Sequence, residues 1–164
     1  IGKNTGAYLA NLEREYSLIT KNKPIFSKPE SRKNRWSLND NYLRFWFRFI
    51  FPNQSLIEMG KYDLLREVID RGYEQYSGLV LEKYFRTKIA KEERITGIGS
   101  YWDNKGENEI DVIAVNDLNK TAIVAEVKRN SKKIDMNILQ SKVHSVKELI
   151  KYKVELQGLS LENM

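Results

Sequence analysis

Two neighbouring apolar segments carry charged side chains, and this feature constrains the fold more than any other. Residues 107–115 form one segment and include Asp111, while residues 121–128 form the other and include Glu126 and Lys128. A charge buried in a strand without a partner is costly, so these three side chains need one. A divalent metal ion beside a phosphate would supply it.

The spacing of these residues predicts their geometry. Side chains two residues apart on a strand share a face, so Glu126 and Lys128 point the same way. Both faces of the 121–128 strand are otherwise apolar, which predicts burial on both sides. Residues 116–120 have the composition of a hairpin loop. Such a loop would lay the two strands antiparallel and bring Asp111 and Glu126 to one edge.

The chemistry of these three residue types suits a metal site. Mg²⁺ takes oxygen ligands, often one or two carboxylates with water and phosphate oxygens. Asp111 and Glu126 fit that role for Mg²⁺ or Mn²⁺, and Lys128 could orient the attacking water or stabilise developing charge. The alternative is an internal ion pair in which Lys128 only neutralises Glu126.

A fourth candidate comes from the helical pattern upstream. Residues 62–70 and 73–90 predict two helices, with Gly72 as the stop between them. The second helix carries one stripe that comprises Gly78, Glu82, Phe85 and Ile89. This stripe places Glu82 among core-facing residues, which is unusual for a glutamate. The alternative is an ordinary ion pair between Glu82 and a neighbouring Lys or Arg of the helix.

The order of these segments resembles the PD-(D/E)XK nuclease core. A helix with Glu82 precedes the Asp111 strand, the Ala125-Glu126-Val127-Lys128 strand, a helix and a last strand, and Ile110-Asp111 stands at the Pro-Asp position. The resemblance implies an α/β (α+β), restriction-endonuclease-like core of order α-β-β-β-α-β. It also implies that Asp111 and Glu126 bind Mg²⁺, that Lys128 assists the water and that Glu82 completes the site.

Several segments, in order, also resemble the C-terminal region of archaeal and bacterial AAA-type ATPases. These are residues 40–50, 97–102, 109–114 and 126–128. In such proteins a P-loop ATPase precedes a winged helix and then this domain of unknown function. The chain contains no Gly-x-x-x-x-Gly-Lys-Ser/Thr motif, so we expect an ATP-binding part upstream of Ile1.

The resemblance and the composition together predict three parts. They are a partial winged helix-turn-helix at 1–38, an aromatic-rich helical linker at 39–72 and the nuclease-like domain at 73–164. In the first part, residues 4–19 have helical spacing. Arg32, Lys33 and Arg35 then precede a short strand. DNA contact by these three side chains is one interpretation, and a wing that docks on another domain or partner is the other.

Three further local signals mark the elements around the site. Asn39 or Asp40 can cap the helix of the linker, whose aromatic residues we interpret as core. Asp135 can cap a helix that runs through Leu139 to Val146. Residues 152–156 can then return as a strand beside the core.

Composition narrows the class of protein. The chain has 164 residues, 28 Lys+Arg against 22 Asp+Glu, a formal charge of +6 and no cysteine. The charge suits DNA as a partner, and the lack of cysteine excludes disulfides and thiolate metal sites. We find no membrane span and no signal-like start, so we expect a cytoplasmic protein.

The sequence predicts a Mg²⁺-dependent DNA nuclease domain of a prokaryotic ATPase. The alternative is a catalytically inactive DNA-binding or protein-interaction module.

Overall fold

The computed structural model describes residues 5–31, 33–92 and 94–164, and it divides into two compact units. The first unit comprises Ile1–Asn22 and Asn34–Tyr76, and the second comprises Lys23–Lys33 and Ser77–Met164. One long helix, α4 (Tyr62–Glu92), contributes to both units.

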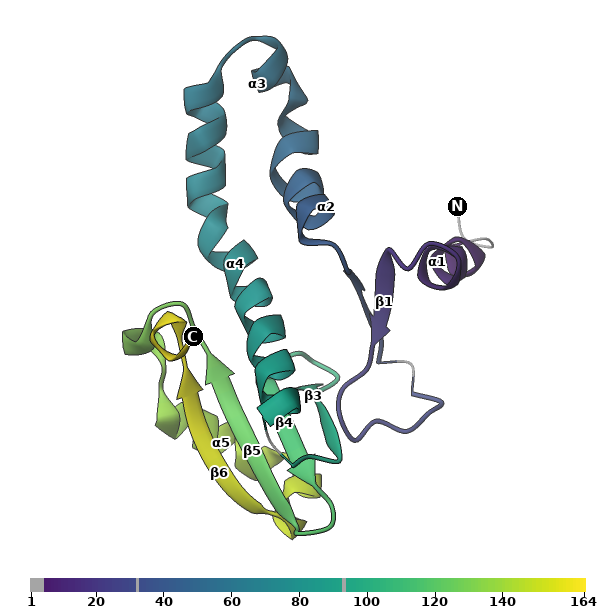
Figure 1. Cartoon of the computed structure of the whole chain (residues 1–164), viewed down its shortest axis with the longest axis vertical. Coiled ribbons are helices and arrows are strands. Elements are labelled where there is room, and N and C mark those ends of the chain that lie inside the picture. The colour runs from purple at the N-terminus through teal and green to yellow at the C-terminus, as the bar shows by residue number, and fades with distance from the viewer. Residues whose placement is uncertain (1–4, 32, 93) are drawn as a thin grey trace. The chain divides into compact units, whose positions relative to one another are not determined.

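The first unit begins with a helix and a small hairpin. Helix α1 (Thr5–Arg14) precedes β1 (Ile19–Asn22), which pairs antiparallel with β2 (Arg35–Leu38) (Figure 1). The helix expected over 4–19 is therefore shorter, and its first residue, Asn4, lies outside the described residues. Ser17 has a φ of 51°, which ends helical geometry, and the buried Ile19 pairs with Leu38 instead.

The linker region folds as short helical pieces. Its elements are α2 (Asn41–Phe45), the π-helix η1 (Trp46–Ile50), the 3₁₀-helix η2 (Phe51–Asn53) and α3 (Gln54–Glu58). Asp40 caps α2, since its carboxylate accepts from the Leu43 N–H at 2.8 Å. The aromatic residues are only partly core. Phe49 is buried between Phe45 and Tyr76, whereas Tyr42, Phe47 and Phe51 are exposed.

Helix α4 runs through Gly72 without a break, so the predicted stop at this residue is wrong. A Cβ at position 72 would lie 2.7 Å from Cε1 of Phe49. Gly72 therefore permits close approach of the buried Phe49 ring rather than ending a helix. The glycine that ends a helix is Gly60, which follows the last turn of α3 and has a φ of 67°.

The second unit is a mixed four-stranded sheet flanked by helices. Its strands are β3 (Gly97–Trp102), β4 (Glu109–Asn116), β5 (Thr121–Val127) and β6 (Lys153–Leu159), in the order β3-β4-β5-β6. The first three strands are antiparallel, and β6 is parallel to β5. The predicted hairpin at 116–120 is confirmed, because Asn116 pairs with Thr121 across it.

Helix α5 (Met136–Ser145) connects the two parallel strands. The 3₁₀-turns η3 (Ser131–Lys133) and η4 (Lys147–Lys151) flank it, and η5 (Leu161–Asn163) follows β6. Asp135 caps α5 by accepting from the N–H groups of Asn137 and Ile138, as predicted. The expected last strand is β6.

Both faces of this sheet are covered, as predicted for β5. On one face, Leu81, Phe85 and Ile89 of α4 pack against Val112, Ala114, Ala125 and Val127. Helix α5 lies on the other face (Figure 1), where its fully buried Leu139 packs with Ile113 and Val124. The unit is thus mixed α+β, with the element order α-β-β-β-α-β. No helix in the described part of the chain is long and apolar enough to cross a membrane.

Candidate active site

Asp111 and Glu126 lie side by side on the paired strands β4 and β5. The register places Val112 opposite Ala125, so the next pair along the ladder is Asp111 and Glu126. Their side chains are 18% and 9% exposed. The hairpin therefore brings two largely desolvated carboxylates to one end of the sheet, as the sequence predicted.

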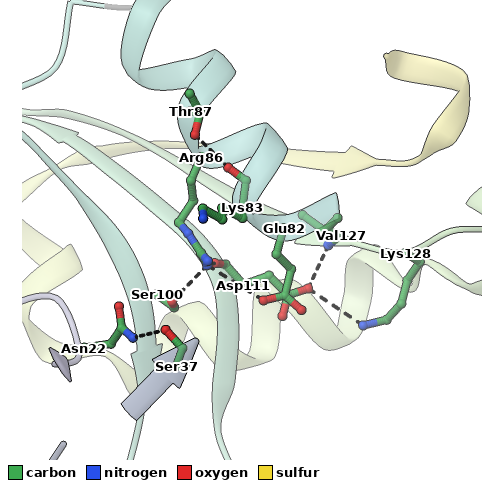
Figure 2. Close-up of polar contacts among 10 residues, drawn as sticks. All are labelled: Asn22, Ser37, Glu82, Lys83, Arg86, Thr87, Ser100, Asp111, Val127 and Lys128. Atoms are coloured by element: carbon green, nitrogen blue, oxygen red, sulfur yellow. Dashed lines mark hydrogen bonds and ion pairs between the residues drawn. The ribbon is translucent and has the colours of Figure 1, made fainter. Parts of the chain in front are cut away.

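Lys128 joins the two carboxylates. Its Nζ lies 2.7 Å from Oε1 of Glu126 and 3.8 Å from Oδ2 of Asp111. The same Asp111 oxygen accepts the N–H of Val127 at 2.8 Å (Figure 2). The structure thus unites three of the four predicted site residues in direct contacts.

A second lysine, Lys142 of α5, was not among the predicted site residues. Its Nζ lies 3.2 Å from Oε2 of Glu126. Lys142 follows the fully buried Leu139 by three residues, which places it on the sheet-facing side of α5. That helical spacing indicates the side of α5 on which Lys142 lies, but it does not identify Glu126 as its partner.

A β-bulge shapes the backbone at Asp111. Gly99 pairs with Ile113 and Tyr101 pairs with Ile110, so Ser100 faces both Asp111 and Val112. A bulge of this kind leaves ladder groups unpaired and redirects a side chain.

Arg86 of α4 fills the gap left by the bulge. Its Nη1 donates to the Asp111 carbonyl oxygen and to Ser100 Oγ, both at 3.1 Å (Figure 2). Arg86 therefore connects the helix to the backbone of a candidate metal ligand.

Glu82 lies one turn before Arg86, and its Oε2 is 3.7 Å from Arg86 Nη1. The alternative of a helical ion pair is thus realised, but the electrostatics also include the site. Burial, followed by the charge of Asp111, raises the pKa of Glu82 to about 7, although Arg86 and Lys128 oppose this. At neutral pH Glu82 is consequently close to half protonated.

The pKa values of the other groups report the same crowding. Burial raises the pKa of Asp111, and the neighbouring Glu126 charge adds to it, while the Val127 N–H opposes it. Burial would lower the pKa of Lys128, but its hydrogen bond to Glu126 and the nearby carboxylates outweigh this and raise it. Lys128 is therefore a cation at neutral pH.

A metal ion would find two carboxylates here rather than three. Within residues 5–31, 33–92 and 94–164, no group of three or more His, Cys, Asp or Glu is placed to hold a metal ion. The Asp111 and Glu126 pair still fits Mg²⁺ chemically, since that ion commonly uses one or two carboxylates plus water and phosphate oxygens. A bound cation would also favour the ionised form of Asp111, whose pKa is raised by burial first and by the Glu126 charge to a smaller extent.

The structure does not test the predicted DNA contact by Arg32, Lys33 and Arg35. Arg32 lies outside the described residues. Lys33 belongs to the second unit, and Arg35 opens β2 in the first; both are exposed. Their contact with DNA stays a prediction.

Comparison with known proteins places the chain in a family. Residues 46–142 match DUF234, a family of archaeal and bacterial proteins of unknown function. The chain belongs to this family. The matched region includes Glu82, Asp111, Glu126 and Lys128 and ends at Lys142.

One relative of the chain is much longer than the chain itself. An uncharacterized protein of Methanocaldococcus jannaschii is 41% identical over 128 residues, which cover 74% of this chain and 28% of the relative. No solved structure matches the chain.

Proposed function

We propose that the second unit is a Mg²⁺-dependent DNA phosphodiesterase with a PD-(D/E)XK-type site. The observation that carries the proposal is the contact geometry of Asp111, Glu126 and Lys128. Asp111 and Glu126 lie opposite each other on paired strands and share Lys128. The Lys128 amine lies 2.7 Å from a Glu126 oxygen and 3.8 Å from an Asp111 oxygen. The element order α-β-β-β-α-β supports the same assignment.

In this proposal Asp111 and Glu126 would hold the metal ion. When bound, such an ion lowers the pKa of a coordinated water and neutralises charge on the phosphate. Lys128 is protonated, so it acts as a hydrogen-bond donor that orients the attacking water or stabilises charge, not as a general base. Glu82, with its pKa of about 7, can hold or release a proton beside the site.

The distribution of charge supports a polyanionic substrate. By sequence, the second unit has 19 Lys+Arg against 14 Asp+Glu, whereas the first has 9 against 8. Nearly all of the positive excess therefore belongs to the unit that contains the site. Such an excess favours binding to phosphate backbones.

We further propose that this domain acts as the C-terminal part of a cytoplasmic AAA-type ATPase. The support is the sequence resemblance and the length of the relative, of which the chain spans 28%. The test is cleavage by the complete polypeptide with and without ATP. A cleavage rate that changes with ATP would support coupling, and an unchanged rate would contradict it.

A catalytically silent DNA-binding or regulatory module is the second candidate. It is favoured by the contacts of Glu126, because Lys128 holds one carboxylate oxygen and Lys142 holds the other. A carboxylate neutralised by two lysines needs no metal ion. This candidate predicts salt-sensitive DNA binding that EDTA does not change.

Cleavage of supercoiled plasmid by single variants separates the two candidates. Asp111→Asn, Glu126→Gln and Lys128→Met should each abolish Mg²⁺-dependent cleavage, whereas Glu155→Gln, an exposed acid on β6, should not. Full cleavage by Asp111→Asn would overturn the nuclease proposal. Melting temperatures near that of the wild type would show that lost cleavage is not lost folding.

A further inference from the structure

Several basic residues follow the candidate site directly in the sequence. Residues 128–133, here called the exit segment, contain Lys128, Arg129, Lys132 and Lys133. No acidic residue lies between Glu126 and Asp135. Lys132 and Lys133 are exposed. The exit segment thus continues the site outward as a cationic surface.

The backbone of the exit segment is held by contacts at both ends. The Lys128 N–H donates to the Leu159 carbonyl at 3.0 Å. Asn130 caps η3, with its side chain accepting from the Lys132 N–H at 3.0 Å and its carbonyl from the Lys133 N–H at 3.0 Å. The segment is therefore ordered before any partner binds.

Side chains reinforce this order. Ser131 Oγ donates to Glu162 Oε1 at 3.0 Å, and Arg129 Nη1 donates to Ser77 Oγ at 2.5 Å. Ile134 packs so closely on β6 that a Cβ at Gly158 would lie 3.0 Å from it. A pre-ordered surface loses less conformational entropy on binding than a flexible one.

The dimensions suit one strand of nucleic acid. Lys132 follows Lys128 by four residues, so their Cα atoms are at most about 14 Å apart. The rise along one strand of DNA is about 3.4 Å per nucleotide. Consecutive phosphates lie farther apart than this axial rise, so exposed lysines of this segment can reach phosphates only a few nucleotides at most from one that lies at Lys128.

We propose that the exit segment binds the phosphodiester backbone of DNA next to the scissile phosphate, with Lys132 and Lys133 each contacting a phosphate. This inference rests on the proposed function, since it takes Asp111, Glu126 and Lys128 as the position of the scissile group. The DNA-binding surface proposed here differs from the one predicted at the wing residues Lys33 and Arg35.

The sheet offers a matched control surface. Lys151 and Lys153, just before and at the start of β6, are also exposed lysines of the second unit. Lys153 pairs with Thr121, whereas the site follows Val127 at the other end of β5. Six residue steps along a strand are roughly 20 Å. A double substitution there removes the same charge from the same unit at a distance from the site.

The experiment is DNA binding measured by fluorescence anisotropy in EDTA, with a short labelled duplex and several salt concentrations. Lys132→Gln/Lys133→Gln should reduce the slope of log affinity against log salt by about 1.8, which is 0.9 for each lost phosphate contact. Lys151→Gln/Lys153→Gln should leave the slope unchanged. Unchanged melting temperatures are expected for both, because the substituted side chains are exposed and the Lys132 N–H is retained.

Several outcomes would overturn the inference. They are an equal loss in both double variants, a loss in neither, and no binding by the wild type at low salt. Asp111→Asn/Glu126→Gln in the same assay separates this inference from the nuclease proposal, since it should bind while failing to cleave. If the wild type never cleaves DNA but only the Lys132→Gln/Lys133→Gln variant has a reduced slope, the nuclease proposal is contradicted. The exit segment is then retained as a DNA-binding surface.

Discussion

Replacing Glu82 by glutamine should stabilise the second unit, and the gain should grow with pH. The Glu82 side chain is 23% exposed, and burial and Asp111 raise its pKa from 4.5 to about 7. Each pKa unit corresponds to about 1.4 kcal/mol, so the ionised carboxylate costs the folded state roughly 3 kcal/mol. Glutamine keeps the shape and carries no charge.

The sign of the pH dependence follows from the raised pKa. Below pH 4.5 the Glu82 carboxyl is protonated in the folded and unfolded chains, so it adds no penalty. As pH rises from 4.5 to about 7 the unfolded chain loses its proton first, and the free energy of unfolding of the wild type falls. Above pH 7 the full penalty is present.

Urea unfolding followed by circular dichroism at pH 4.5, 6 and 8 would measure this effect. The advantage of Glu82→Gln over the wild type should be about 3 kcal/mol larger at pH 8 than at pH 4.5. Glu67→Gln is the matched control, since Glu67 forms the same i,i+4 pair with Arg71 on α4 but is 58% exposed. Its effect should stay below about 1 kcal/mol at every pH. An advantage of Glu82→Gln that is absent or equal at pH 4.5 and 8 would refute the reasoning.

Three other predictions follow from particular contacts. In urea unfolding, Gly72→Ala should lower the free energy of unfolding by about 1–3 kcal/mol, because the added Cβ would meet the buried Phe49 ring. Gly78→Ala on the same helix should raise the free energy of unfolding by about 0.5–1 kcal/mol, because a Cβ there would enter open space. Arg86→Met should lower the cleavage rate at least ~10-fold, because the Asp111 carbonyl oxygen loses its side-chain donor, and shift the pH profile of the rate upward, because Glu82 loses a neighbouring cation. Arg86→Lys should recover part of the rate. Glu126→Ala should reduce stability by about 3 kcal/mol, since it leaves Lys128 and Lys142 without their carboxylate; an unchanged melting temperature would contradict the contact network.

The sequence was sufficient for the parts of the second unit that depend on local patterning. Alternating apolar residues and the polar loop at 116–120 define the β4–β5 hairpin, and the period of two places Glu126 and Lys128 on one face. The cap at Asp135 is equally local. Asp111, Glu126 and Lys128 were therefore predictable as one cluster from the sequence alone.

Contacts between distant segments were not predictable in this way. Gly72 has the composition of a helix stop, and only the Phe49 ring packed against it shows why a glycine stands within α4. At the bulge between β3 and β4, Arg86 donates to Ser100, 14 residues away in the sequence, and to the carbonyl of Asp111, 25 residues away. No local pattern encodes such pairs. Lys142 reaches Glu126 only because α5 crosses the sheet between two parallel strands.

The most direct test of the central claim is cleavage of supercoiled and branched DNA in Mg²⁺ and in Mn²⁺. The wild type is compared with the isosteric Asp111→Asn/Glu126→Gln double variant, purified in parallel so that a contaminating nuclease would appear in both. Cleavage by the wild type that disappears in the double variant is the predicted result. Equal cleavage by the two proteins, or none by either, would contradict a metal-dependent nuclease site at Asp111 and Glu126.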